Sequence, residues 1–341
     1  MAPLPTFGLD PIAWRVLTLE PLIAGFCLLV LRLPLSITGV IALFAGIAIV
    51  ASQIGQARMR AADFMHRVPS TLLGAGAGAA KPTSVLYIPG LGEALIYPKP
   101  SRPGQRPLLL YRWLWDTPGA SPLPARMIEP PAGWHIDLGS PAYVASVLDA
   151  IEAELLGKPH ARLLVVGNSR GAGVLLYALT YAGLQRPKLR AVLGQIVGAV
   201  FLVGPFDSIE QTLGHRYGRW AEWLATKDPW LAVAHGEPHR FEWLARTFPF
   251  ANRFDGPGRF PLKDMGKWTA EIPLPFSVLF VTSKADTALR PAAVRAAHDA
   301  VRVGVDKKKM LLELTAAPHS LLWADDIDLL AIRHACDQTF V

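Results

Sequence analysis

The stretch LLVVGNSRGAGVLLYAL, residues 163–179, joins two kinds of apolar pattern at a short polar turn. Its first part, LLVVG, is a continuous apolar run, which is typical of a strand buried on both faces. From Arg170 onward the apolar residues have helical spacing. Between the two parts, Gly167 and Gly171 flank Ser169 in a G-x-S-x-G pattern. Because glycines allow a sharp backbone turn, the pattern predicts a serine hydroxyl lifted above the end of a strand.

The same alternation of patterns continues through the sequence that follows residue 82. The apolar runs expected to form strands are 84–90, 161–167, 197–204, 276–282 and 310–315. The segments with helical periodicity are 141–157, 170–184, 290–302 and 320–338. This alternation predicts the α/β class, a mainly parallel sheet with helices on both faces. The segment 95–135 is less readable, since RPLLLYRWLW fits either a helix or a strand.

With a G-x-S-x-G at a strand-to-helix turn, the chain resembles the α/β-hydrolase superfamily. The resemblance implies an acid and then a histidine, in loops after later strands. Asp286 and His319 stand in such loops, in that order. The resemblance therefore implies Ser169 as the nucleophile, His319 as its base and Asp286 as the carboxylate that orients the base. Asp207, after another expected strand, is the alternative acid; taken singly, Asp286 also suits a helix cap and His319 an ordinary loop histidine.

The resemblance also implies an oxyanion hole made of two backbone amides. One belongs to Arg170, directly after the serine. The other is expected in YIPGLGE, where Leu91 is the candidate because Gly90 and Gly92 let its backbone turn inward. A simple glycine turn explains the same residues. The Arg170 side chain is expected to face either an anionic group of the substrate or a structural carboxylate.

A long insertion, residues 205–275, separates two of the expected strands and exceeds a usual crossover connection. The resemblance implies that it forms a cap over the active site. Half of the chain's tryptophans lie in it: Trp220, Trp223, Trp230, Trp243 and Trp268. Trp220, Trp223 and Trp243 are the candidates for an apolar substrate pocket. The alternative, which suits most of these tryptophans, is that they only pack the cap on the main domain.

The N-terminal residues differ from the rest, because the segment 33–57 contains no charged residue. About 20 apolar residues suffice to cross the hydrocarbon layer of a membrane. We therefore expect residues 1–60 to be a membrane anchor of one helix or a two-helix hairpin, 61–82 a linker, and 83–341 the hydrolase domain. A cleaved signal peptide and a buried globular helix are the alternatives.

The arginines beside this apolar run indicate an orientation. Arg58, Arg60 and Arg67 follow the run closely, whereas Arg15 and Arg32 precede it. Since cytoplasmic flanks carry the excess of positive charge, the hydrolase domain is expected on the cytoplasmic face of a bacterial-type inner membrane. The periplasmic or extracellular side is the alternative.

The composition excludes several other kinds of function. The net charge is +7, but the basic residues are scattered and their only run, 307–309, is explained by a solvated loop, so we expect no nucleic-acid partner. Cys27 and Cys336 are the only cysteines, which excludes a disulfide framework or a cysteine-based zinc site. HGEPH, 235–239, lacks the order of a zinc protease motif. We expect no metal and no organic cofactor.

Together these features predict a membrane-anchored serine hydrolase that cleaves a lipid-like or other hydrophobic carboxylic ester through an acyl-enzyme. An acyltransferase or a thioesterase with the same three residues is the first alternative. A non-catalytic binding protein that shares the fold is the second. The sequence indicates no oligomeric state.

Overall fold

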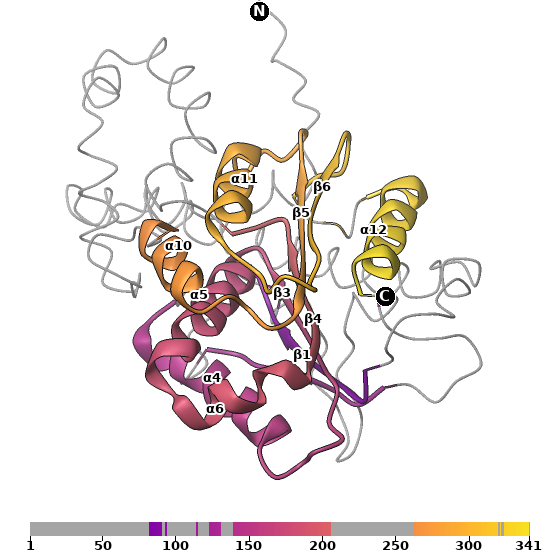
Figure 1. The fold of residues 1–341 in the computed structure, drawn as a ribbon. Coiled ribbons are helices and arrows are strands. Elements are labelled where there is room, and N and C mark those ends of the chain that lie inside the picture. Colours follow the sequence, from indigo (N-terminus) through magenta and orange to yellow (C-terminus); the bar gives the residue numbers. More distant parts are fainter. Residues whose placement is uncertain are drawn as a thin grey trace, which may run out of the picture.

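The computed structural model describes residues 82–90, 93, 114, 123–130, 139–205, 262–319, 321 and 324–340. Within them, six strands form one sheet in the order β2-β1-β3-β4-β5-β6, and every pair of neighbours is parallel (Figure 1). The strands are β1 (Ser84–Ile88), β2 (Ala125–Met127), β3 (Leu163–Asn168), β4 (Ile196–Leu202), β5 (Ser277–Ser283) and β6 (Lys309–Leu314). Because all of them are parallel, their carboxyl ends lie along the same edge of the sheet.

Helices connect these strands. They are α4 (Pro141–Leu155), α5 (Arg170–Gln185), α6 (Pro187–Val192), the 3₁₀ turn η3 (Leu193–Gln195), α10 (Leu262–Glu271), α11 (Pro291–Ala300) and α12 (Asp326–Thr339). The helix expected at 320–338 begins six residues later than predicted. Its start is set by Asp325, whose side chain accepts the backbone N–H of Asp328 at 2.8 Å and so caps the helix.

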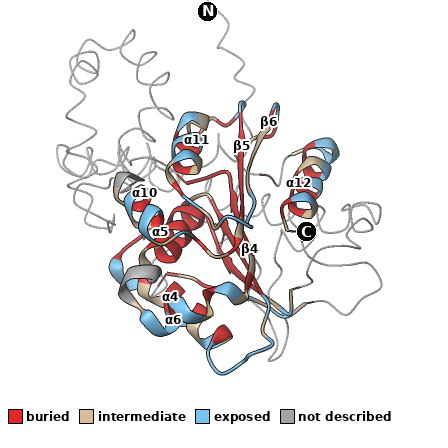
Figure 2. Ribbon diagram, viewed as in Figure 1, coloured by how far each residue is buried: buried red, intermediate tan, exposed pale blue. Residues whose placement is uncertain are grey.

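The sheet is covered on both faces. Alternate residues of β1 point to opposite sides, so that Leu86 and Ile88 join one apolar core while Val85 and Tyr87 join the other. The first core includes residues of α4, α5, α6, α10 and α11, and the second includes residues of α12. Figure 1 shows α12 on one side of the sheet and the other labelled helices on the opposite side. The central strands are buried along their length (Figure 2).

The end of the expected cap insertion belongs to the main body. Helix α10 lies within the range 205–275, yet Met265 and Trp268 pack into the first core. The Trp268 ring contacts Tyr177 and Tyr181 of α5, with ring centroids 5.8 and 5.5 Å apart. This tryptophan is therefore a packing residue. Trp220, Trp223, Trp230 and Trp243 lie outside the described residues, as does most of the insertion.

The expected anchor, residues 1–60, and nearly all of the linker after it lie outside the described residues; within the described ranges, no helix is both long and apolar enough to cross a bilayer.

Cys336 packs in the second core, and burial raises the pKa of its thiol to about 12. Cys27 lies outside the described residues.

Candidate active site

Ser169 occupies a sharp turn between β3 and α5, at the carboxyl end of the central strand. Its φ is +49°, a left-handed conformation that non-glycine residues rarely adopt. The turn is fixed from both sides, because the Ser169 amide donates to the carbonyl of Leu202 at 2.8 Å and the Ser169 carbonyl accepts from Ala172 at 3.0 Å. The hydroxyl is thereby held at the edge of the sheet where loops from other strands converge.

The glycines of the pentapeptide are required by close packing. A Cβ atom on Gly167 would lie 2.7 Å from the Cα of Ala172. A Cβ atom on Gly171 would overlap the carbonyl oxygen of Ile88 at the end of β1. The glycines therefore let α5 begin directly against the sheet, which is the close approach that the sequence pattern predicts.

His319 lies beside the serine hydroxyl, although the two residues are 150 positions apart in the sequence. Its Nε2 is 2.8 Å from the Oγ of Ser169, and its Nδ1 is 2.8 Å from Oδ2 of Asp286. A carboxylate only accepts hydrogen bonds, so Nδ1 carries the proton and the lone pair of Nε2 faces the hydroxyl. The imidazole is 19% exposed, whereas the Asp286 side chain is 1% exposed.

The loop after β5 orients the Asp286 carboxylate. Oδ1 accepts the backbone N–H groups of Ala288 and Leu289, at 2.7 and 2.8 Å. With Oδ1 held in this way, Oδ2 is directed at the imidazole. The N-cap of α11 is Arg290, so Asp286 does not cap that helix. The arrangement can do what a serine nucleophile needs: accept its proton on a histidine and stabilise the resulting charge with a fixed carboxylate.

A buried acidic residue, Glu93, lies beside the turn that carries Ser169 and was not predicted from the sequence. Its Oε2 accepts the Tyr87 hydroxyl at 2.6 Å and the Gly90 amide at 2.8 Å, and its Oε1 accepts the side-chain amide of Asn168. Burial raises the pKa of the Glu93 carboxyl, while these three hydrogen bonds and the charge of Arg170 act to lower it. The signal in the sequence is the single acidic residue in the turn YIPGLGE.

The Arg170 side chain contacts the same loop. Its Nη2 donates to the carbonyl oxygens of Pro89 and Gly90, each at 3.2 Å, and its guanidinium lies over the Tyr143 ring, 5.4 Å from the centroid. Arg170 is only 3% exposed. Of the two expected partners, an anionic group of the substrate or a structural carboxylate, these contacts favour a structural role: the side chain donates to two backbone carbonyls, and its charge acts to lower the pKa of Glu93.

Several predicted site residues lie outside the described residues: Leu91, Asp207, Trp220, Trp223 and Trp243. The loop that leads into Leu91 is described as far as Gly90, whose amide already donates to Glu93. The Gly90 amide is therefore already engaged in a hydrogen bond, and the predicted donor Leu91 stays a prediction. In the described part of the chain, no group of three or more acidic, histidine or cysteine side chains is arranged to hold a metal ion.

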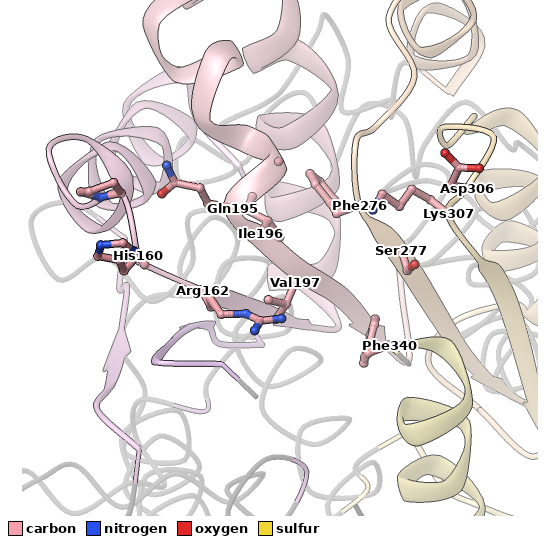
Figure 3. Close-up of a pocket in the computed structure, with 13 residues that line it drawn as sticks. His160, Arg162, Gln195, Ile196, Val197, Phe276, Ser277, Asp306, Lys307 and Phe340 are labelled. Atoms are coloured by element: carbon pink, nitrogen blue, oxygen red, sulfur yellow. The ribbon is translucent and has the colours of Figure 1, made fainter. Parts of the chain in front are cut away.

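A cavity of about 610 Å³ lies at the opposite edge of the sheet, away from Ser169. Its lining includes residues just before or at the start of strands, among them Arg162 beside β3, Ile196 in β4 and Ser277 in β5 (Figure 3). Because parallel strands place these residues at their amino ends, this cavity is separate from the Ser169 site and does not serve it.

Comparison with known proteins gives structural matches alone. No family model matches the sequence, and no curated protein sequence matches it. Similar solved structures include a monoacylglycerol lipase of Paleococcus ferrophilus, with 15% identity, 76% of this chain and 96% of that chain covered, and a TM-score of 0.38. An esterase of the bacterial hormone-sensitive lipase family has 16% identity, coverage of 78% and 79%, and a TM-score of 0.44. An esterase of Pyrococcus furiosus has 12% identity, coverage of 76% and 82%, and a TM-score of 0.40.

These values describe a loose overlap of whole chains and do not identify a substrate. The topology is more informative. A parallel sheet carries a strained strand–serine–helix turn in its centre, and an aspartate and a histidine follow later strands at the same edge. The chain has the α/β-hydrolase fold.

Proposed function

We propose that this protein is a serine hydrolase that cleaves a carboxylic ester of a lipid or another hydrophobic acyl compound. The observation that carries the proposal is the continuous chain of hydrogen bonds from Ser169 through His319 to Asp286, with both distances at 2.8 Å. Three side chains from three different loops meet in the order and geometry that acyl transfer to a serine requires.

In the first half of the proposed reaction, Ser169 Oγ attacks the ester carbonyl carbon while Nε2 of His319 accepts the hydroxyl proton. The carbonyl oxygen becomes an oxyanion, which the backbone amides of Arg170 and Leu91 would stabilise. The tetrahedral adduct then expels the alcohol, which takes the proton from His319. The product of this half is an acyl ester on Ser169.

In the second half, a water molecule attacks the acyl carbon and gives its proton to His319. Collapse of the second tetrahedral adduct breaks the bond to Ser169 Oγ, which recovers the proton from the imidazole. The carboxylic acid leaves. Throughout, Asp286 keeps the imidazole in the tautomer that accepts at Nε2, because its own position is fixed by the amides of Ala288 and Leu289.

The preference for a hydrophobic ester rests on the tryptophan-rich insertion between β4 and β5. Trp220, Trp223 and Trp243 are the residues proposed to contact the acyl chain. Trp268 is excluded from this role because its ring packs against Tyr177 and Tyr181 of α5.

We also propose that residues 1–60 anchor the enzyme to a membrane, with the hydrolase domain on the cytoplasmic side of a bacterial-type inner membrane. The support is the uncharged segment 33–57 and the arginines that follow it. An anchor would hold the active site near a lipid substrate.

Hydrolysis of p-nitrophenyl esters with acyl chains of increasing length tests the proposed function. The parent is expected to release p-nitrophenol, and Ser169→Ala to lose that activity by at least about 10³-fold. Ser146→Ala is the matched control, because Ser146 lies on α4 and its hydroxyl only donates to the Tyr143 carbonyl. A Ser169→Ala variant as active as the parent would overturn the proposal.

The same assay identifies the acid. Asp286→Asn is expected to lower kcat by about 10⁴-fold, because an asparagine no longer fixes the tautomer of the imidazole. Asp149→Asn, which changes an exposed aspartate paired with Arg186, is expected to leave kcat unchanged. Normal turnover by Asp286→Asn would instead assign the role to Asp207.

A further inference from the structure

The two residues that flank Ser169 in the GNSRG turn, Asn168 and Arg170, both extend their side chains to the loop after β1. Asn168 donates to the carboxyl of Glu93, and Arg170 donates to the carbonyls of Pro89 and Gly90. The turn that carries the serine and the loop expected to supply an oxyanion donor are thus tied to each other by side chains on both sides of Ser169.

The two ties act on opposite groups of the same short backbone segment. The Glu93 carboxyl accepts the N–H of Gly90. The Arg170 guanidinium, which can only donate, bonds to the C=O of Gly90 and to that of Pro89. The Glu93 amide also donates back to the carbonyl of Gly90, at 3.4 Å, which closes the turn. With both its N–H and its C=O engaged, Gly90 is held through the peptide groups on both sides of its Cα atom.

Gly90 lies directly against Ser169. A Cβ atom on Gly90 would be 3.3 Å from the Cβ of Ser169 and 3.2 Å from the side-chain nitrogen of Asn168. A displacement of the loop by a fraction of an ångström would therefore change its distance to the serine. The next residue in the chain is Leu91, whose amide is the proposed second oxyanion donor.

The polar groups that make these ties are buried, so they cannot exchange their partners for water. Glu93 is 8% exposed, and Tyr87, Asn168 and Arg170 are more deeply buried still. A charge in such surroundings is stable only where it is compensated and hydrogen-bonded. The cluster is therefore held by buried contacts inside the protein: Arg170 donates to backbone carbonyls, and Glu93 accepts from the Gly90 amide and from two buried side chains.

We propose that Glu93 and Arg170 are positioning residues that hold the loop after β1 against Ser169, and that the oxyanion-binding geometry of the active site depends on them. This inference rests on the proposed serine hydrolase function. An oxyanion donor acts only at about 2.7–3.1 Å from the developing charge, and loss of one donor lowers kcat by about 10²–10³-fold. Loosening the loop is expected to reduce transition-state stabilisation while leaving substrate binding in place.

The test compares Glu93→Ala, Glu93→Gln and Arg170→Lys with the parent in ester hydrolysis. Each variant keeps the backbone amide at its position, so only the side-chain ties are removed. Glu93→Ala is expected to lower kcat about 10²-fold with KM within about twofold of the parent. Glu93→Gln, which can still accept the Gly90 amide, is expected to recover at least about tenfold of that loss. Arg170→Lys is expected to lower kcat about tenfold, since one ammonium group cannot reproduce the guanidinium contacts.

A second readout separates positioning from general damage to the fold. An alkyl boronic acid adds to the serine and mimics the tetrahedral adduct, so its inhibition constant should rise in each variant by the same factor as kcat falls. Glu271→Gln, an exposed substitution at the end of α10, is the control and should match the parent in both measurements.

The outcomes separate this inference from the function on which it rests. A folded Glu93→Ala with parental kcat, or variants whose KM rises while boronic acid affinity stays unchanged, would overturn the positioning role alone. If Glu93→Ala does not fold, the same criteria applied to Arg170→Lys decide. A parent without ester hydrolysis would overturn both proposals.

Discussion

Ser169 holds a backbone conformation that costs about 1–3 kcal/mol for a residue with a side chain. The surrounding structure stabilises this conformation. Gly167 and Gly171 pack closely against neighbouring backbone, and the Ser169 amide donates a hydrogen bond to the carbonyl of Leu202. Strain of this kind is typical of functional positions, where it fixes a reactive group in one place. In this conformation the serine hydroxyl lies 2.8 Å from Nε2 of His319.

The buried carboxyl of Glu93 should make stability depend on pH in a defined direction. Burial raises its pKa above the ordinary 4.5, so the folded state binds this proton more tightly than the unfolded state. Its contribution to the free energy of unfolding is fully present below pH 4.5 and is lost as the pH rises through the folded-state pKa. Glu93→Gln cannot ionise and loses this dependence.

Urea denaturation across a pH series measures this effect. The free energy of unfolding of Glu93→Gln minus that of the parent is expected to increase as the pH rises from about 4.5, whatever its value at the acidic end. Glu271→Gln provides the baseline, since it removes an exposed carboxyl. A difference that stays constant with pH would show that the Glu93 pKa is not raised.

At the scale of elements, the strands were predictable because each central one is a continuous apolar run. β1, β3, β4, β5 and β6 lie within about two residues of the expected ranges at each end. The three-residue strand β2 and the short helix α6 carry too few residues for a periodic pattern, and neither was predicted. The helix α10 was assigned to a cap because loop length gives no information on where an insertion ends.

The contact between α5 and β1 gives a prediction at this scale. Gly171→Ala places a Cβ atom on the carbonyl of Ile88, so α5 has to shift away from the sheet. We expect a loss of about 3 kcal/mol or more in the free energy of unfolding, measured by urea denaturation, together with loss of activity. Gly194→Ala is the control, because nothing lies within 4 Å of its added Cβ atom. Equal stability of the two variants would contradict the close packing.

At the scale of the whole molecule, the sheet explains which parts of the candidate site the sequence could and could not indicate. Ser169, Asp286 and His319 could be predicted to lie together from their positions after strands, because a parallel sheet brings all such loops to one edge. The Glu93 cluster was not predicted. Its links to the turn that carries Ser169 join residues 75 or more positions apart, such as Asn168 with Glu93, and no local pattern encodes such a pairing.

The N-terminal segment gives a prediction for the full-length chain. If residues 1–60 anchor the protein, carbonate extraction of membranes should leave the full-length chain in the pellet, because an inserted apolar helix is not released by high pH. A chain that begins near residue 83 should appear in the supernatant under the same conditions. Release of the full-length chain into the supernatant would contradict the proposed anchor.

Covalent labelling shows whether His319 and Asp286 activate Ser169 as a nucleophile. The folded parent is incubated with a fluorophosphonate, and the site and stoichiometry of the adduct are determined by mass spectrometry. We expect one adduct per chain on Ser169, none on Ser169→Ala, and much slower labelling of a folded Asp286→Asn. An unlabelled parent, or equal labelling of Ser169→Ala, would rule out Ser169 as the activated nucleophile.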